Sequence, residues 1–236
     1  MNLTRHKKLV ILTGAGISAE SGIRTFRAAD GLWENHRIED VATPEAFARN
    51  PQLVHQFYNQ RRRQLHGPAI APNAAHKALA RLEAEWEGGF LLVTQNVDNL
   101  HERAGSKRLL HMHGSLIKVF CKSCDQHADW LDDLNESIAC PACEQRGRMR
   151  PDIVWFGEMP YHMDTIASAL EECELFLSIG TSGQVYPAAG FAREAWNAHR
   201  IEINLGETGI SDAFHDHRIG AAGIEVPKLV EELLKL

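Results

Sequence analysis

Four of the five cysteines form two closely spaced pairs. Two residues separate Cys121 from Cys124 and Cys140 from Cys143, and 15 residues lie between the pairs. Such spacing predicts a zinc site with four thiolate ligands, since each pair can bend around one metal ion. Four thiolates leave no position for water, so we expect one Zn²⁺ with a structural role. An iron–sulfur site and redox-active thiols are the alternatives for the same residues.

A glycine-rich turn follows the first apolar run of the chain. Gly14, Gly16 and Ala19 fit the pattern G-x-G-x-x-G/A. Such glycines let a backbone approach a pyrophosphate, and the N-terminus of the following helix offers N–H donors. A tight strand-to-helix turn without a ligand is the alternative. No acidic residue is recognisable at the tip of a second strand, so a hydride-transferring dehydrogenase fits less well.

Short apolar runs alternate with helical patterns and would position these motifs. The strand-like runs are 7–12, 90–93, 175–179 and 201–203, and the helical patterns are 75–86, 163–173, 188–198 and 226–236. Strands that alternate with helices predict an α/β fold with a Rossmann-like, doubly wound parallel sheet. Ligands of such sheets bind beyond the carboxyl ends of the strands. We expect that edge to carry Gly14, Ser18, Gln95, Asn96, Asp98, Thr181, Ser182 and Asn204.

Two segments interrupt this alternation and suggest a smaller domain. Residues 31–72 hold a loop and helical stretches, and residues 116–155 hold the cysteines with little apolar periodicity. We expect residues 1–30, 73–115 and 156–236 to form the large Rossmann-like domain and residues 116–155 to form a zinc ribbon. Because the ribbon has little core of its own, zinc would supply much of its folding free energy.

The composition excludes several classes of protein. Hydrophobic residues make up 44% and charged residues 24%, and 31 acidic residues outnumber 25 basic ones. This balance disfavours direct nucleic-acid binding, which needs a basic surface. The apolar run after Lys8 is too short for a signal peptide, and no stretch could span a membrane. An odd number of cysteines with paired spacing suits a reducing compartment, so we expect a cytoplasmic protein with no membrane partner.

Several strings together resemble the sirtuin family. They are GAGISAESGIRTFR, GLW, TQNVDNLH with RAG after it, the HG of HMHGS, the paired cysteines, and GTS with VYPA. The resemblance covers essentially the whole chain in the expected order. It implies a protein-lysine deacylase that consumes NAD as a co-substrate and releases nicotinamide and 2′-O-acyl-ADP-ribose. An NAD-linked oxidoreductase, an ADP-ribosyl transferase and a non-enzymatic NAD or zinc-ribbon module are the rival interpretations.

The resemblance nominates His113 as the general base, although the chain has 13 histidines and His111 lies two residues away. An imidazole has a pKa near neutrality and suits the removal of a proton from a ribose hydroxyl. The family likeness further implies that Asn96 and Asp98 orient the ribose and carboxamide, although a short polar string at a strand tip could also be a mere cap. Phe26 and Arg27 would shield the reactive carbon and contact the phosphates. The full set of implied NAD-binding residues is Gly14, Ala15, Gly16, Ser18, Glu20, Thr25, Phe26, Arg27, Trp33, Gln95, Asn96, Val97, Asp98, Gly180, Thr181, Ser182, Asn204, Leu205, Gly206 and Ala222.

The spacing of Tyr58 and Arg61 resembles the Tyr-x-x-Arg of the class III sirtuins, which accept acidic acyl groups. Residues three apart share a helix face, and arginine offers a two-donor fork to a carboxylate. Ala42 resembles the small residue that leaves room for a longer acyl chain. A solvated basic face at Arg61, Arg62 and Arg63, with Tyr58 in the core, is the alternative. The resemblance therefore implies desuccinylase and demalonylase activity alongside deacetylase activity.

A final motif would hold the substrate peptide. Val154, Phe156, Gly157 and Glu158 resemble the loop that pairs with the peptide as an added strand. An ordinary buried strand edge is the alternative for these residues. The expected partners are acylated lysines of other proteins, metabolic enzymes among them, with nicotinamide as product and inhibitor.

Overall fold

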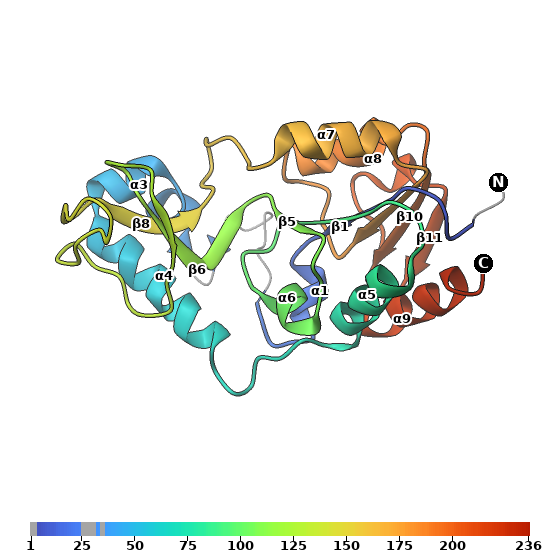
Figure 1. Ribbon diagram of the computed structural model, residues 1–236, viewed down its shortest axis with the longest axis horizontal. Helices are drawn as coiled ribbons and strands as arrows, with labels where there is room; N and C mark the ends of the chain where they lie inside the picture. Colours follow the sequence, from blue (N-terminus) through green and yellow to red (C-terminus); the bar gives the residue numbers. More distant parts are fainter. Residues whose placement is uncertain (1–3, 25–31, 34–35) are drawn as a thin grey trace.

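The chain forms two lobes that lie side by side. The computed structural model describes residues 4–24, 32–33 and 36–236. In Figure 1 the larger lobe contains the long parallel sheet with its helices, and the smaller lobe contains α3, α4, β6 and β8. The predicted α/β fold with a smaller second domain is confirmed.

A six-stranded parallel sheet forms the large lobe. Its strand order is β11-β10-β9-β1-β4-β5. Its strands are β1 (Leu9–Thr13), β4 (Phe90–Thr94), β5 (Leu109–His111), β9 (Leu175–Ile179), β10 (His199–Asn204) and β11 (Asp216–Ile219). Thr13 pairs with Thr94 on one side and with Ile179 on the other, so the central strands end at the same edge. The chain order reverses between β1 and β9, which is where doubly wound sheets bind ligands.

Helices cover both faces of this sheet. They are α1 (Gly16–Ala19), α5 (Ala74–Glu85), α6 (Leu100–Ala104), α7 (Met163–Glu172), η1 (Ala188–Gly190), α8 (Phe191–Glu194), η2 (Ser211–Ala213) and α9 (Ala222–Leu233). Leu9 and Ile11 share a core with α5 and α9, whereas Val10 and Leu12 share one with α7 and α8. Figure 1 shows α7 and α8 on one side of the sheet and α5 and α9 on the other. A strand covered on both faces needs apolar residues throughout, which explains the unbroken run in β1.

The small lobe combines helices with a second sheet. Its elements are β2 (Leu32–Trp33), β3 (His36–Arg37), α2 (Ile38–Val41), α3 (Pro44–Arg49), α4 (Pro51–Leu65), β6 (Gly114–Cys121), β7 (His127–Asp129) and β8 (Met149–Ile153). Strand β6 pairs antiparallel with both β7 and β8. Thr43 and Asn50 cap α3 and α4 by accepting hydrogen bonds from backbone N–H groups, and a proline opens each helix. Such caps and N-terminal prolines are typical helix starts.

Buried polar groups tie α4 to strand β6 and to the loop that follows β7. The Arg62 side chain donates hydrogen bonds to the carbonyl oxygens of Leu116 (2.8 Å) and Asp132 (3.1 Å). The Asn59 amide exchanges two 2.9 Å hydrogen bonds with the backbone of Leu134. Because Arg62 and Asn59 are buried, these bonds replace the water that the polar groups lose on folding.

The boundaries of several elements differ from the sequence expectations, and three of these differences are informative. The helical pattern over 188–198 becomes a 3-10 turn followed by α8, which ends at Glu194 because buried Ala195 already turns the chain toward β10. Helix α9 begins at Ala222, four residues before the expected start. There the Glu20 carboxylate accepts a hydrogen bond from the Gly223 N–H, a cap supplied from the other end of the chain. Strand β6 starts at Gly114, two residues before the expected ribbon. Among the helices of residues 4–24, 32–33 and 36–236, none has the length and apolar character needed to cross a bilayer.

Candidate active site and metal centre

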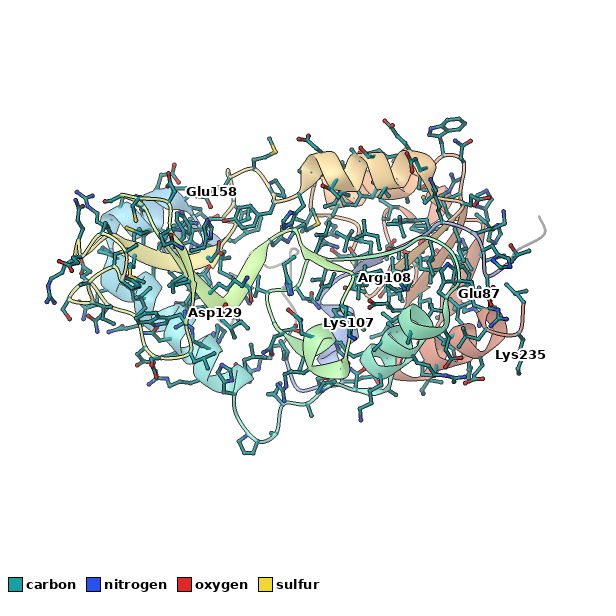
Figure 2. The ribbon with its side chains drawn as sticks, in the orientation of Figure 1. Glu87, Lys107, Arg108, Asp129, Glu158 and Lys235 are labelled. Atoms are coloured by element: carbon teal, nitrogen blue, oxygen red, sulfur yellow. The ribbon has the colours of Figure 1, made fainter. Side chains whose placement is uncertain are left out.

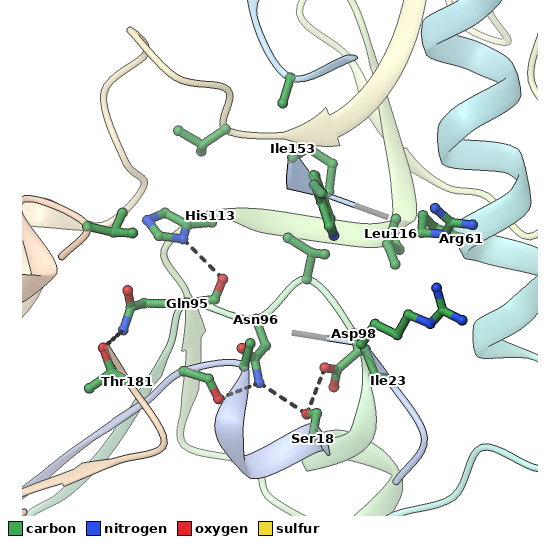
Figure 3. A pocket seen from close by; sticks show the side chains of 18 of the residues that line it. Ser18, Ile23, Arg61, Gln95, Asn96, Asp98, His113, Leu116, Ile153 and Thr181 are labelled. Atoms are coloured by element: carbon green, nitrogen blue, oxygen red, sulfur yellow. Dashed lines mark hydrogen bonds between the residues drawn. The ribbon is translucent and has the colours of Figure 1, made fainter. Parts of the chain in front are cut away.

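A cavity of about 470 Å³ lies between the two lobes. The carboxyl edge of the large sheet and the small lobe both contribute to its walls. Figure 3 shows His113 on one side of this pocket and Arg61 on the other, with Ile153 and Leu116 between them in this view. The pocket therefore brings the predicted base and the predicted acyl-binding arginine to one site.

The glycine-rich turn packs directly against the end of β9. A Cβ atom on Gly16 would lie 2.7 Å from the Gly180 Cα, and one on Gly14 would lie 2.8 Å from the Gly180 carbonyl oxygen. Gly180 has a φ of +64°, which favours glycine, and a Cβ there would lie 2.5 Å from the Ile17 nitrogen. Gly14, Ala15, Gly16 and Gly180 all line the pocket. Backbone that lines the pocket at the point where the chain order reverses fits a dinucleotide, whose pyrophosphate needs a close approach of the backbone.

Replacing Gly180 with alanine should lower the melting temperature by about 2–12 °C. The left-handed conformation alone costs roughly 1–3 kcal/mol, and the contact with the Ile17 backbone adds strain. A loss of 1 kcal/mol shifts Tm by about 2–4 °C in a chain of this size. Gly209→Ala is the matched control, since a Cβ there has no heavy atom within 4 Å. Equal melting temperatures for the two variants, measured by calorimetry, would contradict the packing argument.

A buried hydrogen-bond network fixes the polar groups that follow β4. The Asn96 amide nitrogen donates to the Gly14 carbonyl and to the Ser18 hydroxyl, both at 3.1 Å. Ser18 donates in turn to the Asp98 carboxylate at 2.9 Å, as Figure 3 shows. Burial raises the pKa of Asp98, while the Leu100 N–H and the Ser18 hydroxyl oppose that shift. The network holds Asn96 and Asp98 at the pocket wall in fixed orientations.

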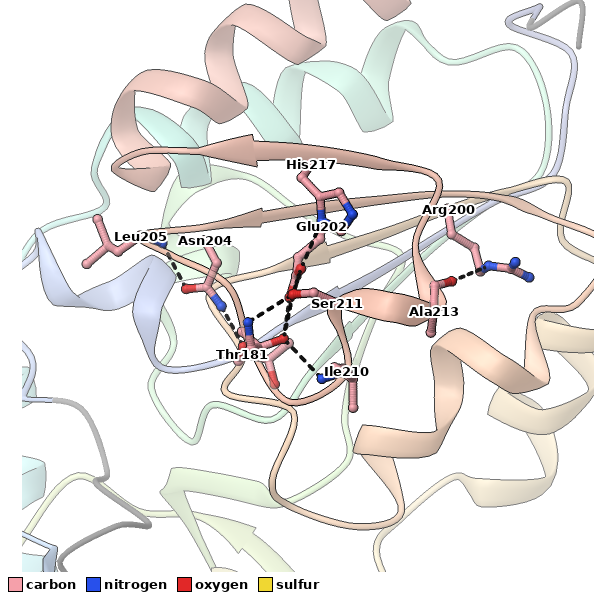
Figure 4. Close-up of polar contacts among 10 residues, drawn as sticks. Thr181, Arg200, Glu202, Asn204, Leu205, Ile210, Ser211, Ala213 and His217 are labelled. Atoms are coloured by element: carbon pink, nitrogen blue, oxygen red, sulfur yellow. Dashed lines mark hydrogen bonds and ion pairs between the residues drawn. The ribbon is translucent and has the colours of Figure 1, made fainter.

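A second network orders the loop after β10. The Asn204 amide donates to the Thr181 carbonyl at 2.6 Å, and the Gln95 amide donates to the Thr181 hydroxyl at 3.1 Å. Buried Glu202 accepts hydrogen bonds from the hydroxyls of Thr208 (2.6 Å) and Ser211 (2.5 Å). Figure 4 shows Glu202 next to Ser211. Thr181, Ser182, Asn204 and Leu205 thereby line the same end of the pocket wall.

The hydrogen bonds of two histidines separate their roles. The Nδ1 atom of His113 lies 3.0 Å from the Gln95 carbonyl oxygen. A carbonyl only accepts, so Nδ1 carries the proton and Nε2 is the basic nitrogen. Both ring nitrogens of His111 face acceptors, the Asn96 carbonyl at 3.0 Å and the Glu102 carboxylate at 2.8 Å. Of these two histidines, His113 is the one that lines the pocket, and its Nε2 is the basic nitrogen there.

The pKa shifts of the two rings agree with this geometry. Burial lowers the pKa of His113, and the Gln95 carbonyl offsets only part of that effect. Burial also acts to lower the pKa of His111, but the Glu102 carboxylate, the Asn96 carbonyl and Asp98 together outweigh it, and the net shift is upward. His113 is therefore neutral at pH 7, as a general base must be, whereas the hydrogen bonds of His111 favour its charged form.

Tyr58 and Arg61, the residues expected to bind the acyl group, lie at the small-lobe side of the pocket. Tyr58 and Arg61 both line it, and Tyr58 is fully buried. The Arg61 guanidinium lies 5.1 Å above the Phe57 ring, which is cation–π geometry. Ala42 is buried and also lines the pocket. Tyr58 lies in the core, as the alternative expected. The solvated basic face, however, describes only Arg63 of the three arginines, because Arg62 is buried and Arg61 lines the pocket.

The expected peptide-binding loop lies along the same pocket. Val154, Phe156, Gly157 and Glu158 line it. The N–H groups of Val154 and Phe156 donate to the carbonyl oxygens of His113 (2.9 Å) and Ala42 (3.0 Å), so this loop joins the base to the acyl side. Glu158, which Figure 2 places on the small lobe, accepts hydrogen bonds from the buried Arg150 guanidinium at 2.7 and 2.8 Å. The Arg150 contact lowers the Glu158 pKa, against the opposing effect of burial.

Some expected NAD-binding residues lie elsewhere. Glu20 caps α9, and Ala222 belongs to the core that this helix covers. Glu20, Gly206 and Ala222 are all absent from the described residues that line the pocket. Thr25, Phe26 and Arg27 lie outside the described residues. Trp33 and Val97 line the pocket as expected. The sequence reasoning omitted several lining residues, of which apolar Leu116, Ile153 and Trp155 form the wall near Tyr58. These apolar residues stand in the sequence next to motif residues that were expected at the site, and this proximity could have indicated that they line the pocket.

The four paired cysteines converge at the end of the small lobe. Their sulfur atoms all lie within 4.8 Å of one another. The Sγ atoms of Cys121 and Cys143 are 3.7 Å apart, and those of Cys124 and Cys140 are 3.8 Å apart. A tetrahedron with Zn–S bonds of about 2.3 Å has edges of about 3.8 Å, so the donor set fits Zn²⁺. Backbone N–H groups of Ser123 and Ala142 point at the sulfurs of Cys121 and Cys140.

We expect metal analysis to find one zinc per chain. Cys121→Ser or Cys140→Ser should remove it and lower both stability and activity, because the adjoining core consists of few residues. Cys173→Ser, which alters a cysteine outside the cluster, should leave the zinc content unchanged. A folded, fully active protein without zinc would exclude the structural role.

Comparisons with known proteins agree on one family. The model of the Sir2 family matches residues 14–187. An NAD-dependent protein deacylase of Bdellovibrio bacteriovorus is 65% identical over 100% of both chains. A solved Sir2 homologue in complex with NAD is 40% identical, covers 97% of this chain and 90% of its own, and has a TM-score of 0.87.

A second solved structure adds the product side of the reaction. It is a mutant Sir2 homologue in complex with 2′-O-acetyl ADP ribose, 39% identical over 97% of this chain and 92% of its own, with a TM-score of 0.86. The family model spans most of the chain, and the relatives match along nearly their whole length. On the strength of the pocket, the cysteine cluster and these likenesses, the chain belongs to the Sir2 family.

Proposed function

We propose that this protein is an NAD-dependent protein-lysine deacylase that releases nicotinamide and 2′-O-acyl-ADP-ribose. The observation that carries the proposal is His113, whose Nδ1 bonds the Gln95 carbonyl and leaves Nε2 as the basic nitrogen, in a pocket that Asn96, Asp98 and the glycine-rich turn also line. The NAD and acetyl-ADP-ribose complexes of Sir2 homologues support it.

The residues of the chain divide the chemistry among them. Gly14, Gly16 and Gly180 would offer backbone to a pyrophosphate, and Thr181 and Asn204 would hold the phosphate–adenosine half. Asn96 and Asp98 offer an amide and a carboxyl group to the nicotinamide and its ribose. The basic Nε2 of His113 accepts the proton of a ribose hydroxyl, and the Gln95 carbonyl stabilises the imidazolium that results.

Product analysis tests the proposal directly. An acyl-lysine peptide with NAD should yield free lysine, nicotinamide and O-acyl-ADP-ribose in equal amounts, measured by mass spectrometry. An oxidoreductase would convert NAD to NADH without releasing nicotinamide, and an ADP-ribosyl transferase would leave ADP-ribose on the protein substrate. A binding module would leave NAD intact, so each rival predicts a different outcome.

The pocket further supports a preference for acidic acyl groups. Tyr58 and Arg61 line it together, and Ala42 has the smallest side chain that could shape the wall there. A carboxylate at the end of a succinyl or malonyl group needs charged or polar partners once it leaves water. We propose desuccinylase and demalonylase activity in addition to deacetylase activity.

The expected biological setting follows from the same chemistry. Acylated lysines of other proteins, metabolic enzymes among them, would be the substrates, and released nicotinamide would inhibit the enzyme as product. Four thiolate ligands require reduced cysteines, which supports a cytoplasmic protein. Inhibition by added nicotinamide in the peptide assay would test the product role.

A further inference from the structure

The Tyr58 hydroxyl contacts the buried indole of Trp155, and both residues line the pocket. The indole nitrogen of Trp155 is 2.9 Å from the Tyr58 hydroxyl oxygen. An indole N–H is a donor only, so the Tyr58 oxygen must accept this bond. The hydroxyl then keeps its own hydrogen for a different direction. Because Tyr58 lines the pocket, an acceptor bound there can receive it.

The indole itself is held on several sides. The Arg150 guanidinium lies 3.4 Å above the Trp155 ring, and the Phe47 ring lies 5.4 Å from it. Glu158 locks Arg150 through two hydrogen bonds and also accepts one from the Trp155 backbone N–H at 2.8 Å. Because Trp155 is only 2% exposed and its ring is held in place, its indole N–H stays directed at the Tyr58 hydroxyl.

We propose that Trp155 is a positioning residue that sets acyl specificity, because its N–H orients the Tyr58 hydroxyl as a hydrogen-bond donor toward an acidic acyl group. The inference rests on the acidic-acyl preference proposed above and names the group that prepares the pocket for it. Burial raises the pKa of Tyr58, with only partial opposition from the Trp155 N–H, so the phenol stays protonated and can donate at neutral pH. A hydroxyl oriented before binding loses less rotational freedom when the carboxylate arrives. Donation from Trp155 also makes the hydroxyl a stronger donor, since chained hydrogen bonds reinforce one another.

The test is a double-mutant cycle on selectivity. The measured quantity is the ratio of kcat/KM for succinyl-lysine peptide to kcat/KM for acetyl-lysine peptide, which cancels a general loss of active enzyme. Trp155→Phe should lower this ratio about three- to tenfold, the range of one net hydrogen bond, through a higher KM for the succinyl peptide. In a Tyr58→Phe background the same substitution should change the ratio less than about twofold, because the hydroxyl to be oriented is gone.

A matched control separates the hydrogen bond from the loss of an indole. Trp130→Phe removes an indole N–H that has no hydrogen-bond partner within residues 4–24, 32–33 and 36–236, so the ratio should not change. If Trp155→Phe does not fold, benzothienylalanine at position 155 keeps the bicyclic shape and lacks only the N–H. The inference is overturned if the ratio stays at its wild-type value, or falls equally in both backgrounds. If Tyr58→Phe and Arg61→Met themselves leave the ratio unchanged, the acidic-acyl proposal fails instead.

Discussion

His113→Ala should lower kcat by about 10²–10⁴-fold while NAD binding remains measurable by calorimetry. General acid–base assistance typically contributes that much, and His113 presents the basic ring nitrogen at the pocket. Because burial lowers its pKa below the usual 6.5, kcat/KM should be at its plateau at pH 7. The rate should fall only as the pH drops through that lowered pKa and the ring becomes protonated.

His111 provides the control for this variant. Its two ring nitrogens hold the Asn96 carbonyl and the Glu102 carboxylate, so His111→Gln should lower Tm while retaining most of kcat. The assignment is wrong if the His111 variant is inactive and the His113 variant is active.

Arg61→Met should raise KM for succinyl-lysine peptide at least about 30-fold and change acetyl-lysine kinetics less than about threefold. Removing one partner of a buried charged hydrogen bond costs roughly 2–5 kcal/mol. An acetyl group has no carboxylate, so acetyl-lysine peptide makes no such bond with Arg61 and should lose little. Tyr58→Phe should act in the same direction with a smaller effect, since it removes a neutral donor. Steady-state kinetics on one peptide sequence that carries acetyl-, malonyl- or succinyl-lysine would measure the effects of both substitutions.

Arg63→Met is the matched control on the same helix. Arg63 is exposed and pairs with Asp133 at 3.4 Å, away from the pocket lining. An exposed ion pair contributes little, so this variant should keep wild-type selectivity. A parallel loss of both activities in Arg61→Met would show that Arg61 is structural.

The sequence predicted the fold where local pattern and global structure agree. The apolar runs that became β1, β4, β9 and β10 are buried on both faces, so their composition alone revealed them. Strands β5 and β11 escaped notice because they are short and partly exposed at the two edges of the sheet. The early start of α9 depends on Glu20, which is 203 residues away from Gly223 in sequence.

The site residues show the same difference between what local sequence predicts and what only the fold brings together. Spacing was enough for the four cysteines, because a metal constrains residues that are close in sequence. It could not distinguish His113 from His111, which differ only in the hydrogen-bond partners that folding gives them. The bond between Tyr58 and Trp155 joins residues 97 positions apart and had no signal in the sequence.

The bonds from Asn59 and Arg62 to β6 and to the loop after β7 have a consequence for moving the acyl preference from one related chain to another. These residues share α4 with Tyr58 and Arg61, and they bind carbonyl groups near Leu116, Asp132 and Leu134. We therefore expect α4 and the ribbon to exchange their amide hydrogens with solvent as one cooperative unit. When this unit opens, the end of the pocket that holds Tyr58 and Arg61 should be exposed before the rest of the pocket. A graft of α4 alone would leave two buried polar side chains without their acceptors, so the donor's ribbon loop would have to be transferred with it.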